Sequence, residues 1–166
     1  ATPEKKLHSG TLSPVDICGT IHYDGVSFRY GYRKWVFQQV TFSVNEGEHV
    51  ALTGTNGSGK STLARLLVGM HEPDTGIITI GGQKISEIEL ECLRKHIIYV
   101  SQIPVLLSGT IREGLLFGCT HSINDELFER IAHGCGVDEI IRDNPFGYDW
   151  ILTENGMNVS GGHRQR

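Results

Sequence analysis

The chain has 166 residues, 39% of them apolar, and a formal net charge of −4. That is enough apolar material for one domain with a substantial core, while the scattered basic residues form no stripe for a nucleic-acid backbone, which argues against nucleic acid as a partner. No apolar run approaches the roughly 20 residues of a membrane helix, and the four widely spaced cysteines form no C-x-x-C pair, which indicates free thiols rather than a zinc or redox site.

The first third of the chain is irregular and then β-prone. Residues 1–20 contain proline, glycine and small polar residues without apolar periodicity, which predicts a linker or irregular lead-in. Residues 21–30 and 40–44 alternate apolar and polar side chains, which predicts half-buried antiparallel strands. Residues 48–53 form a short apolar-rich run, which predicts a buried strand leading into a glycine-rich loop.

This loop is the most informative part of the sequence, because it matches the pattern G-x-x-x-x-G-K-[ST]. Glycines let successive backbone N–H groups point at one anion, Lys60 adds a cation for the terminal phosphates, and Ser61 offers a hydroxyl to Mg²⁺. Residues 61–68 have leucines at helical spacing, so a helix N-terminus adds its positive dipole end to the loop. A glycine-rich turn that matches by chance is the alternative, and the order strand, loop, helix disfavours it. The predicted nucleotide-binding residues are Gly54, Thr55, Asn56, Gly57, Ser58, Gly59, Lys60, Ser61 and Thr62.

Further elements follow the loop. Residues 77–80 and 97–100 are compact β-prone runs, and the second predicts a buried central strand. Residues 88–95 are typical of a helix, as are a segment from Asn124 or Asp125 to His133 and a shorter one at 138–142. The stretch 108–146 therefore predicts a helical insertion. Gln102 follows the run at 97–100, at a strand end where α/β proteins form ligand crevices.

Three segments outside the loop carry a resemblance to one family. Tyr30 ends the first alternating segment, Gln102 follows a predicted strand, and residues 159–166 read V-S-G-G-H-R-Q-R. With the loop, in this order and spacing, they resemble the nucleotide-binding domains of ABC transporters, from about residue 21 to the last residue. The resemblance implies an α/β fold with a P-loop NTPase (RecA-like) core, an antiparallel β subdomain and a helical insertion.

The resemblance also implies roles for single residues. Tyr30 would stack on adenine, although a strand tyrosine more often fills a core or an edge. Gln102 would place its amide oxygen on Mg²⁺ or the attacking water, and its loop would contact the membrane-spanning part; a solvated loop glutamine is the alternative. The segment Ser160, Gly161 and Gly162 would begin a helix and face the ATP held by a second nucleotide-binding domain in a head-to-tail dimer. The implied cofactors are ATP and Mg²⁺, with Ser61 and Gln102 as metal ligands.

Within the family, residues 106–115 and 153–158 are similar to segments of bacterial peptide, bacteriocin or toxin exporters. This subclass implies a position on the cytoplasmic face of the cell membrane, with a membrane-spanning domain as partner. Four positions depart from the family pattern, and His163 would tune the dimer interface through its charge if it reaches the partner's nucleotide. These departures are Asn56, Gly114, Val159 and His163.

The sequence ends at Arg166, before the family's acidic Walker B strand, catalytic glutamate and switch histidine. We therefore expect residues 21–166 to be the N-terminal part of a nucleotide-binding domain that holds none of the family's catalytic residues and turns over little or no ATP. We also expect a gap in the parallel sheet beside the loop and a frayed C-terminus, because about one turn of the last helix is encoded.

Two functions remain open from the sequence. One is the ATPase engine of a membrane exporter, and the other is a soluble ABC-type module that uses ATP as a conformational switch without moving cargo. Apolar runs of membrane length before Ala1 would favour the first, and a soluble continuation would favour the second. A P-loop kinase is disfavoured, because such an enzyme has no use for the segment at 160–162.

Overall fold

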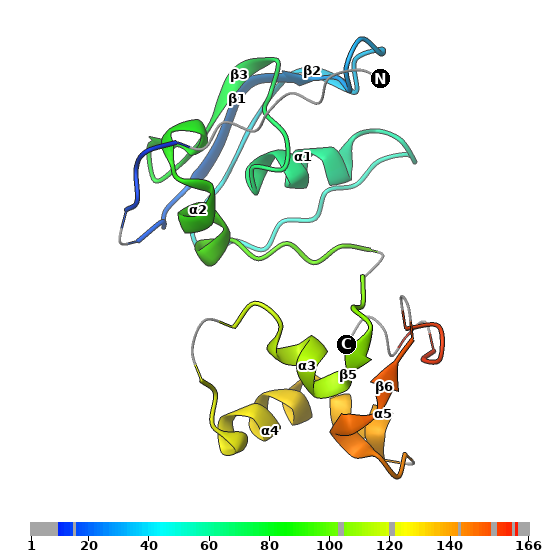
Figure 1. Ribbon diagram of the computed structural model, residues 1–166. Coiled ribbons are helices and arrows are strands. Elements are labelled where there is room, and N and C mark those ends of the chain that lie inside the picture. The colour runs from blue at the N-terminus through cyan, green and yellow to red at the C-terminus, as the bar shows by residue number, and fades with distance from the viewer. Residues whose placement is uncertain are drawn as a thin grey trace. The chain divides into compact units, whose positions relative to one another are not determined.

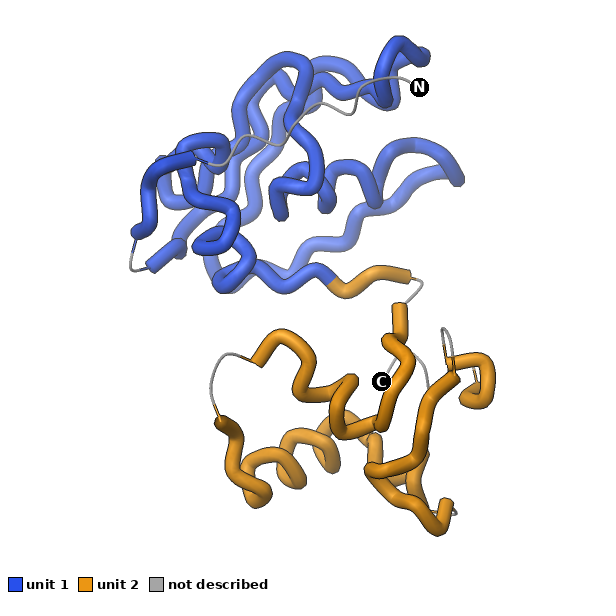
Figure 2. Tube along the Cα trace, viewed as in Figure 1, with its two compact units in different colours: residues 1–99 blue, residues 100–166 orange. Residues whose placement is uncertain are grey.

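The structure is a computed structural model that describes residues 10–14, 16–102, 105–119, 122–142, 144–153, 156–160 and 162. The chain divides into two compact units, residues 1–99 and residues 100–166 (Figures 1 and 2). The phosphate-loop motif lies in the first unit, and the predicted helical insertion lies in the second.

The first unit contains a four-stranded antiparallel sheet with the strand order β2-β1-β3-β4. The predicted antiparallel strands are confirmed, and at the start of β1 the alternation holds, with Tyr23 buried between exposed His22 and Asp24. A register shift between Tyr23 and Val26 then breaks the alternation, so that Val26, Ser27 and Phe28 are all buried. The strands are β1 (Ile21–Phe28), β2 (Phe37–Val44), β3 (Thr75–Ile80) and β4 (Gln83–Lys84).

The helix α1 (Lys60–Leu67) packs on the inner face of this sheet. The hydroxyl of Tyr23 on β1 donates a hydrogen bond to the Leu63 carbonyl at 2.9 Å, and Leu66 is fully buried in the same core as Val26. The 3₁₀ helix η1 (Ile85–Glu87) and the helix α2 (Leu90–His96) add Leu93 and neighbouring apolar side chains to this core. The helices predicted at 61–68 and 88–95 are thus confirmed, with boundaries shifted by one or two residues.

The described part of the lead-in has no helix, but it is attached to the first unit. The Leu12 amide donates to the Glu87 carbonyl at 2.9 Å, and the Glu89 amide donates to the Leu12 carbonyl at 2.8 Å. Leu12 also forms an isolated parallel bridge with Ile88. Residues 10–12 therefore pack against the segment that precedes α2.

Two predicted strands are wrong. Residues 48–53 and 97–100 belong to no strand, and several of their apolar side chains are exposed, such as Leu52 by 45% and Ile98 by 86%, although Ile97 packs against the core of the first unit. A β-prone run becomes a strand only when a neighbouring strand supplies hydrogen-bond partners, and β-propensity depends on that context. No described segment pairs with either run, so both stay extended without forming a ladder.

The second unit is a small helical cluster with a two-stranded ladder. Asn124 caps the longest helix by accepting a hydrogen bond from the Leu127 amide at 2.8 Å, as its position before Asp125 predicts. The buried core contains Ile111, Ala132 and Leu152. The elements are β5 (Gly109–Thr110), α3 (Ile111–Leu116), α4 (Asp125–Gly134), α5 (Val137–Ile141), the 3₁₀ helix η2 (Gly147–Asp149) and β6 (Ile151–Leu152).

The insertion was predicted to hold two helices, and α4 and α5 confirm both. The helix α3 was missed, although Thr110 and Glu113 form the three-residue spacing of a capping box. Within the described part of the chain, no helix is long and apolar enough to span a bilayer.

Candidate functional site: a phosphate loop with an adjoining tyrosine

The glycines of the loop adopt backbone conformations that other residues rarely reach. The φ angles are 147° at Gly54, 82° at Gly57 and 92° at Gly59, all positive. Gly59 is also packed closely, since a Cβ there would lie 2.7 Å from Cδ1 of Phe37 and 2.8 Å from Cγ1 of Val36. The turn into α1 therefore requires glycine for both its dihedral angles and its lack of a side chain.

Lys60 closes the loop through its side chain. Its Nζ atom donates hydrogen bonds to the carbonyls of Gly54 and Thr55, each at 2.9 Å. The ammonium group therefore lies against the backbone at the start of the loop. Residues 54–58 and Ser61 are exposed to solvent, so a ligand can approach the loop from outside.

The N-terminus of α1 is suited to an anion. Its N-cap is Gly59, which offers no side chain to the first amides, and its first turn holds no acidic residue. The unpaired N–H groups of a helix start and the helix dipole both favour negative charge at this end. The loop, the Lys60 ammonium and the start of α1 therefore concentrate donors and positive charge in one exposed region.

Tyr30 is brought to this region from the end of β1. Its phenol oxygen lies 3.1 Å from Oγ1 of Thr62, in the first turn of α1. Its ring makes edge contacts with Phe28 and His71, and hydrogen bonding to Tyr99 and Tyr30 raises the pKa of Arg65 on α1. The tyrosine predicted to stack on adenine thus lies beside the helix that begins at the phosphate loop.

Trp35 lies between β1 and β2 and contacts Arg29. The Arg29 guanidinium carbon lies 4.4 Å from the centre of a Trp35 ring, in a cation–π contact. Arg29 also pairs with Asp74, whose carboxylate accepts the Arg29 amide at 3.0 Å. This cluster fixes the segment between β1 and β2.

The other predicted site residues belong to the second unit. Gln102 and Ser160 are exposed, and Gly162 has helical backbone conformation. Gly161 and His163 lie outside the described residues, as does the predicted fraying beyond Gly162. The structure therefore brings Tyr30 to the loop, while the roles of Gln102 and the segment at 160–162 stay predictions.

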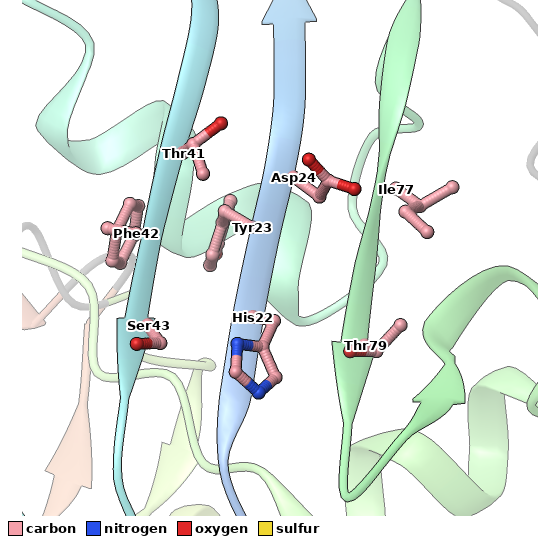
Figure 3. A pocket seen from close by; sticks show the side chains of 8 residues that line it. All are labelled: His22, Tyr23, Asp24, Thr41, Phe42, Ser43, Ile77 and Thr79. Carbon is pink, nitrogen blue, oxygen red and sulfur yellow. The ribbon is translucent and has the colours of Figure 1, made fainter.

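A hollow of about 360 Å³ lies elsewhere, on the outer face of the antiparallel sheet (Figure 3). Its lining includes His22 and Asp24 of β1 and Thr79 of β3, together with Tyr23 and Phe42. The Tyr23 hydroxyl reaches to the opposite face and bonds to α1, so the sheet lies between this hollow and the helix that begins at the phosphate loop. Among the residues described, no group of three or more His, Cys, Asp or Glu could hold a metal ion.

Comparison with known proteins decides the family. The model of the family described as ABC transporter matches residues 37–166. The chain belongs to the ABC transporter family. The predicted fold class is confirmed with it, and nucleotide binding follows from membership. A solved structure titled "Structure of a bacterial Atm1-family ABC exporter with ATP bound" is similar with a TM-score of 0.83 and 28% identity, and covers 97% of this chain and 29% of that one.

Relatives of this ABC transporter chain are transport proteins by name. It is 39% identical over 150 residues to the mitochondrial ATP-dependent permease MDL2 of Saccharomyces cerevisiae, covering 89% of this chain and 19% of that protein. It is 36% identical over 148 residues to the transport/processing ATP-binding protein ComA of Streptococcus pneumoniae, covering 89% and 21%. It is 37% identical over 166 residues to the lactococcin-G-processing and transport ATP-binding protein LagD of Lactococcus lactis subsp. lactis, covering 99% and 24%.

The chain thus spans about a fifth to a quarter of the length of these relatives. Because all three are transport proteins, they favour the exporter interpretation over the soluble switch.

Sequence reasoning missed two neighbours of Tyr30 in this ABC transporter chain. Arg65 lies three residues after Thr62 on α1, a spacing that places both on one helix face, but only the tertiary structure shows that Tyr30 meets this face. His71 lies far from Tyr30 in sequence, and its contact with that ring depends on how the chain returns from α1 to the sheet. No local pattern announces it.

Proposed function

We propose that this chain is the ATP-binding part of an ABC exporter ATPase and that it binds ATP together with Mg²⁺. Residues 54–62 hold the phosphates, Tyr30 stacks on adenine, and Ser61 and Gln102 serve the metal ion. Lys60 neutralises charge on the terminal phosphates, whose oxygens suit a compact ammonium donor.

In the full-length protein, ATP is sandwiched between two such domains in a head-to-tail dimer. Ser160, Gly161 and Gly162 of one domain face the nucleotide held by the phosphate loop of the other. The dimer acts on a membrane-spanning domain from the cytoplasmic face of the membrane. The exported cargo is a peptide, a choice supported by LagD, whose name gives lactococcin-G processing and transport, and by the sequence of residues 106–115.

One observation carries this proposal. A tyrosine just after β1 contacts Thr62, the residue that directly follows the motif whose lysine closes the phosphate loop. An aromatic ring therefore lies beside a helix N-terminus that suits an anion. A nucleotide needs both groups, because the ring can stack on the base and the helix N-terminus can bind the phosphates.

The test is a titration of the full-length protein with a non-hydrolysable ATP analogue and Mg²⁺. Lys60→Ala should weaken binding roughly 10- to 100-fold, because it removes hydrogen bonds from a charged donor. The matched control is Lys95→Ala, because Lys95 is an exposed lysine of the first unit whose ammonium group pairs with Glu91 on the same helix, α2. Equal affinity of Lys60→Ala and the unaltered protein would refute the assignment of the loop.

A further inference from the structure

Three aromatic rings meet at the end of β1. The ring of Tyr30 lies 4.9 Å from that of Phe28 and 5.3 Å from that of His71, with an interplanar angle of 88° in both cases. The rings of Phe28 and His71 are 5.5 Å apart and inclined by only 34°. Tyr30 therefore stands nearly perpendicular to two neighbours at once, and rotating its ring would lose both favourable edge contacts.

The phenol end of Tyr30 is fixed separately. Its oxygen lies 3.1 Å from Oγ1 of Thr62, and its hydrogen bonding contributes to the raised pKa of Arg65. Thr62 is buried, so this partner has little freedom of its own. The two ends of the Tyr30 side chain are thus held by different groups.

Both sets of contacts lead back to α1. Thr62 lies in its first turn, and His71 follows its last turn, where Gly69 turns the chain with a φ of 65°. The Gly69 amide donates to the Leu66 carbonyl at 3.1 Å, and the Met70 amide donates to the Arg65 carbonyl at 2.9 Å. These bonds fix the backbone that carries His71 relative to the helix.

The charge state of His71 fits a role as an aromatic wall. Burial, and to a smaller extent the nearby Arg65 guanidinium, lower the pKa of His71 below its ordinary value. The imidazole is therefore neutral at physiological pH, and it meets Tyr30 as an uncharged ring.

We propose that His71 is a positioning residue that sets the plane of the Tyr30 ring for stacking on adenine. Stacking requires a defined ring plane, and a ring held before the ligand arrives spends less conformational entropy on binding. Tyr30 contacts Thr62 in the first turn of α1 and His71 just after the helix. These contacts hold the Tyr30 ring in a fixed position relative to the backbone amides that bind phosphate. The inference rests on the proposed adenine role of Tyr30 and adds to it a residue that decides affinity for the base.

The experiment measures two affinities in the full-length protein, one for a non-hydrolysable ATP analogue with Mg²⁺ and one for inorganic tripolyphosphate. His71→Ala should weaken binding of the ATP analogue about 2- to 10-fold, which corresponds to the free energy of one aromatic pair. Binding of tripolyphosphate should be unchanged. His71→Phe should restore the analogue's affinity to within about twofold, because it keeps a neutral ring. His133→Ala is the matched control, as an exposed histidine on α4 of the second unit.

A second arm repeats the measurement in the background Tyr30→Ala. There, His71→Ala should cause no further loss of affinity, because the ring that His71 orients is gone. The inference is overturned if His71→Ala changes neither affinity, weakens both equally, or causes the same loss without Tyr30, and also if His71→Phe is as weak as His71→Ala.

The two proposals fail in different ways. If Lys60→Ala leaves binding of both ligands intact, the assignment of the phosphate loop is wrong, and the inference on His71 falls with it. If Lys60 is required and Tyr30→Ala lowers binding of the ATP analogue alone, but His71→Ala does nothing, only the inference on His71 is wrong.

Discussion

Gly59, Lys60 and His71 show how single residues shape the first unit. Gly59 has a positive φ and no room for a Cβ beside Phe37. Any other residue there would be strained both in its backbone dihedral angle and by a clash of its Cβ with Phe37. Lys60 is recognisable from the motif alone, since its spacing from the glycines defines it. His71 belongs to no sequence motif, and its contact with Tyr30 is seen only in the tertiary structure.

The lowered pKa of His71 makes the stability of the first unit depend on pH. The unfolded chain takes up the proton near pH 6.5, while the folded chain takes it up only at lower pH. The stability that comes from the neutral ring is therefore complete above about pH 6.5 and is lost as the pH falls through the folded-state pKa.

We expect the urea midpoint of the unaltered protein to fall more steeply between about pH 7 and pH 5 than that of His71→Phe. The comparison cancels the other histidines, which both proteins share. Parallel pH profiles would show that the imidazole at position 71 titrates alike in the folded and unfolded chain.

Among the elements, α3 depends most clearly on its ends. It has six residues, too few to be stable alone, and its capping box joins Thr110 and Glu113 reciprocally. The Glu113 amide donates to Thr110 Oγ1 at 3.1 Å, and the Thr110 amide donates to Glu113 Oε2 at 2.8 Å. Ile111, buried in the second unit, then anchors the first turn in the core.

Thr110→Val should lower the free energy of unfolding by about 1 kcal/mol, because valine keeps the shape of threonine but cannot accept the Glu113 amide. Thr110→Ser is the matched control and should retain most of the stability, since its hydroxyl can cap the same amide. Urea denaturation of both variants measures the difference, and a valine variant as stable as the serine variant would contradict the capping role.

At the scale of the whole molecule, each unit has its own core, and the extended runs at 48–53 and 97–100 contribute no ladder to either. In the antiparallel sheet, β1 pairs with β2 on one side and with β3 on the other. Protection of amides from solvent should therefore differ sharply between these parts of the chain.

In hydrogen exchange of the 166-residue chain, we expect the amides of β1 to exchange orders of magnitude more slowly than those of residues 50–53 and 98–100. Opening the β1 ladder requires disruption of the core around Val26, whereas the two runs pair with no other segment that the structure describes. Similar exchange rates in β1 and in these runs would show that both runs pair in solution.

The sequence alone determined what depends on local order: the phosphate loop, the alternating strands of the antiparallel sheet, the helix after the loop and the family that these motifs resemble. Spacing and periodicity carry that information because glycine conformation, side-chain alternation and helix repeat are properties of neighbouring residues. The tertiary structure decided what depends on partners distant in sequence. Among the described residues it gave the runs at 48–53 and 97–100 no pairing strand, and a strand exists only with a neighbour. It also placed His71 against Tyr30, because the chain returns to the sheet after α1.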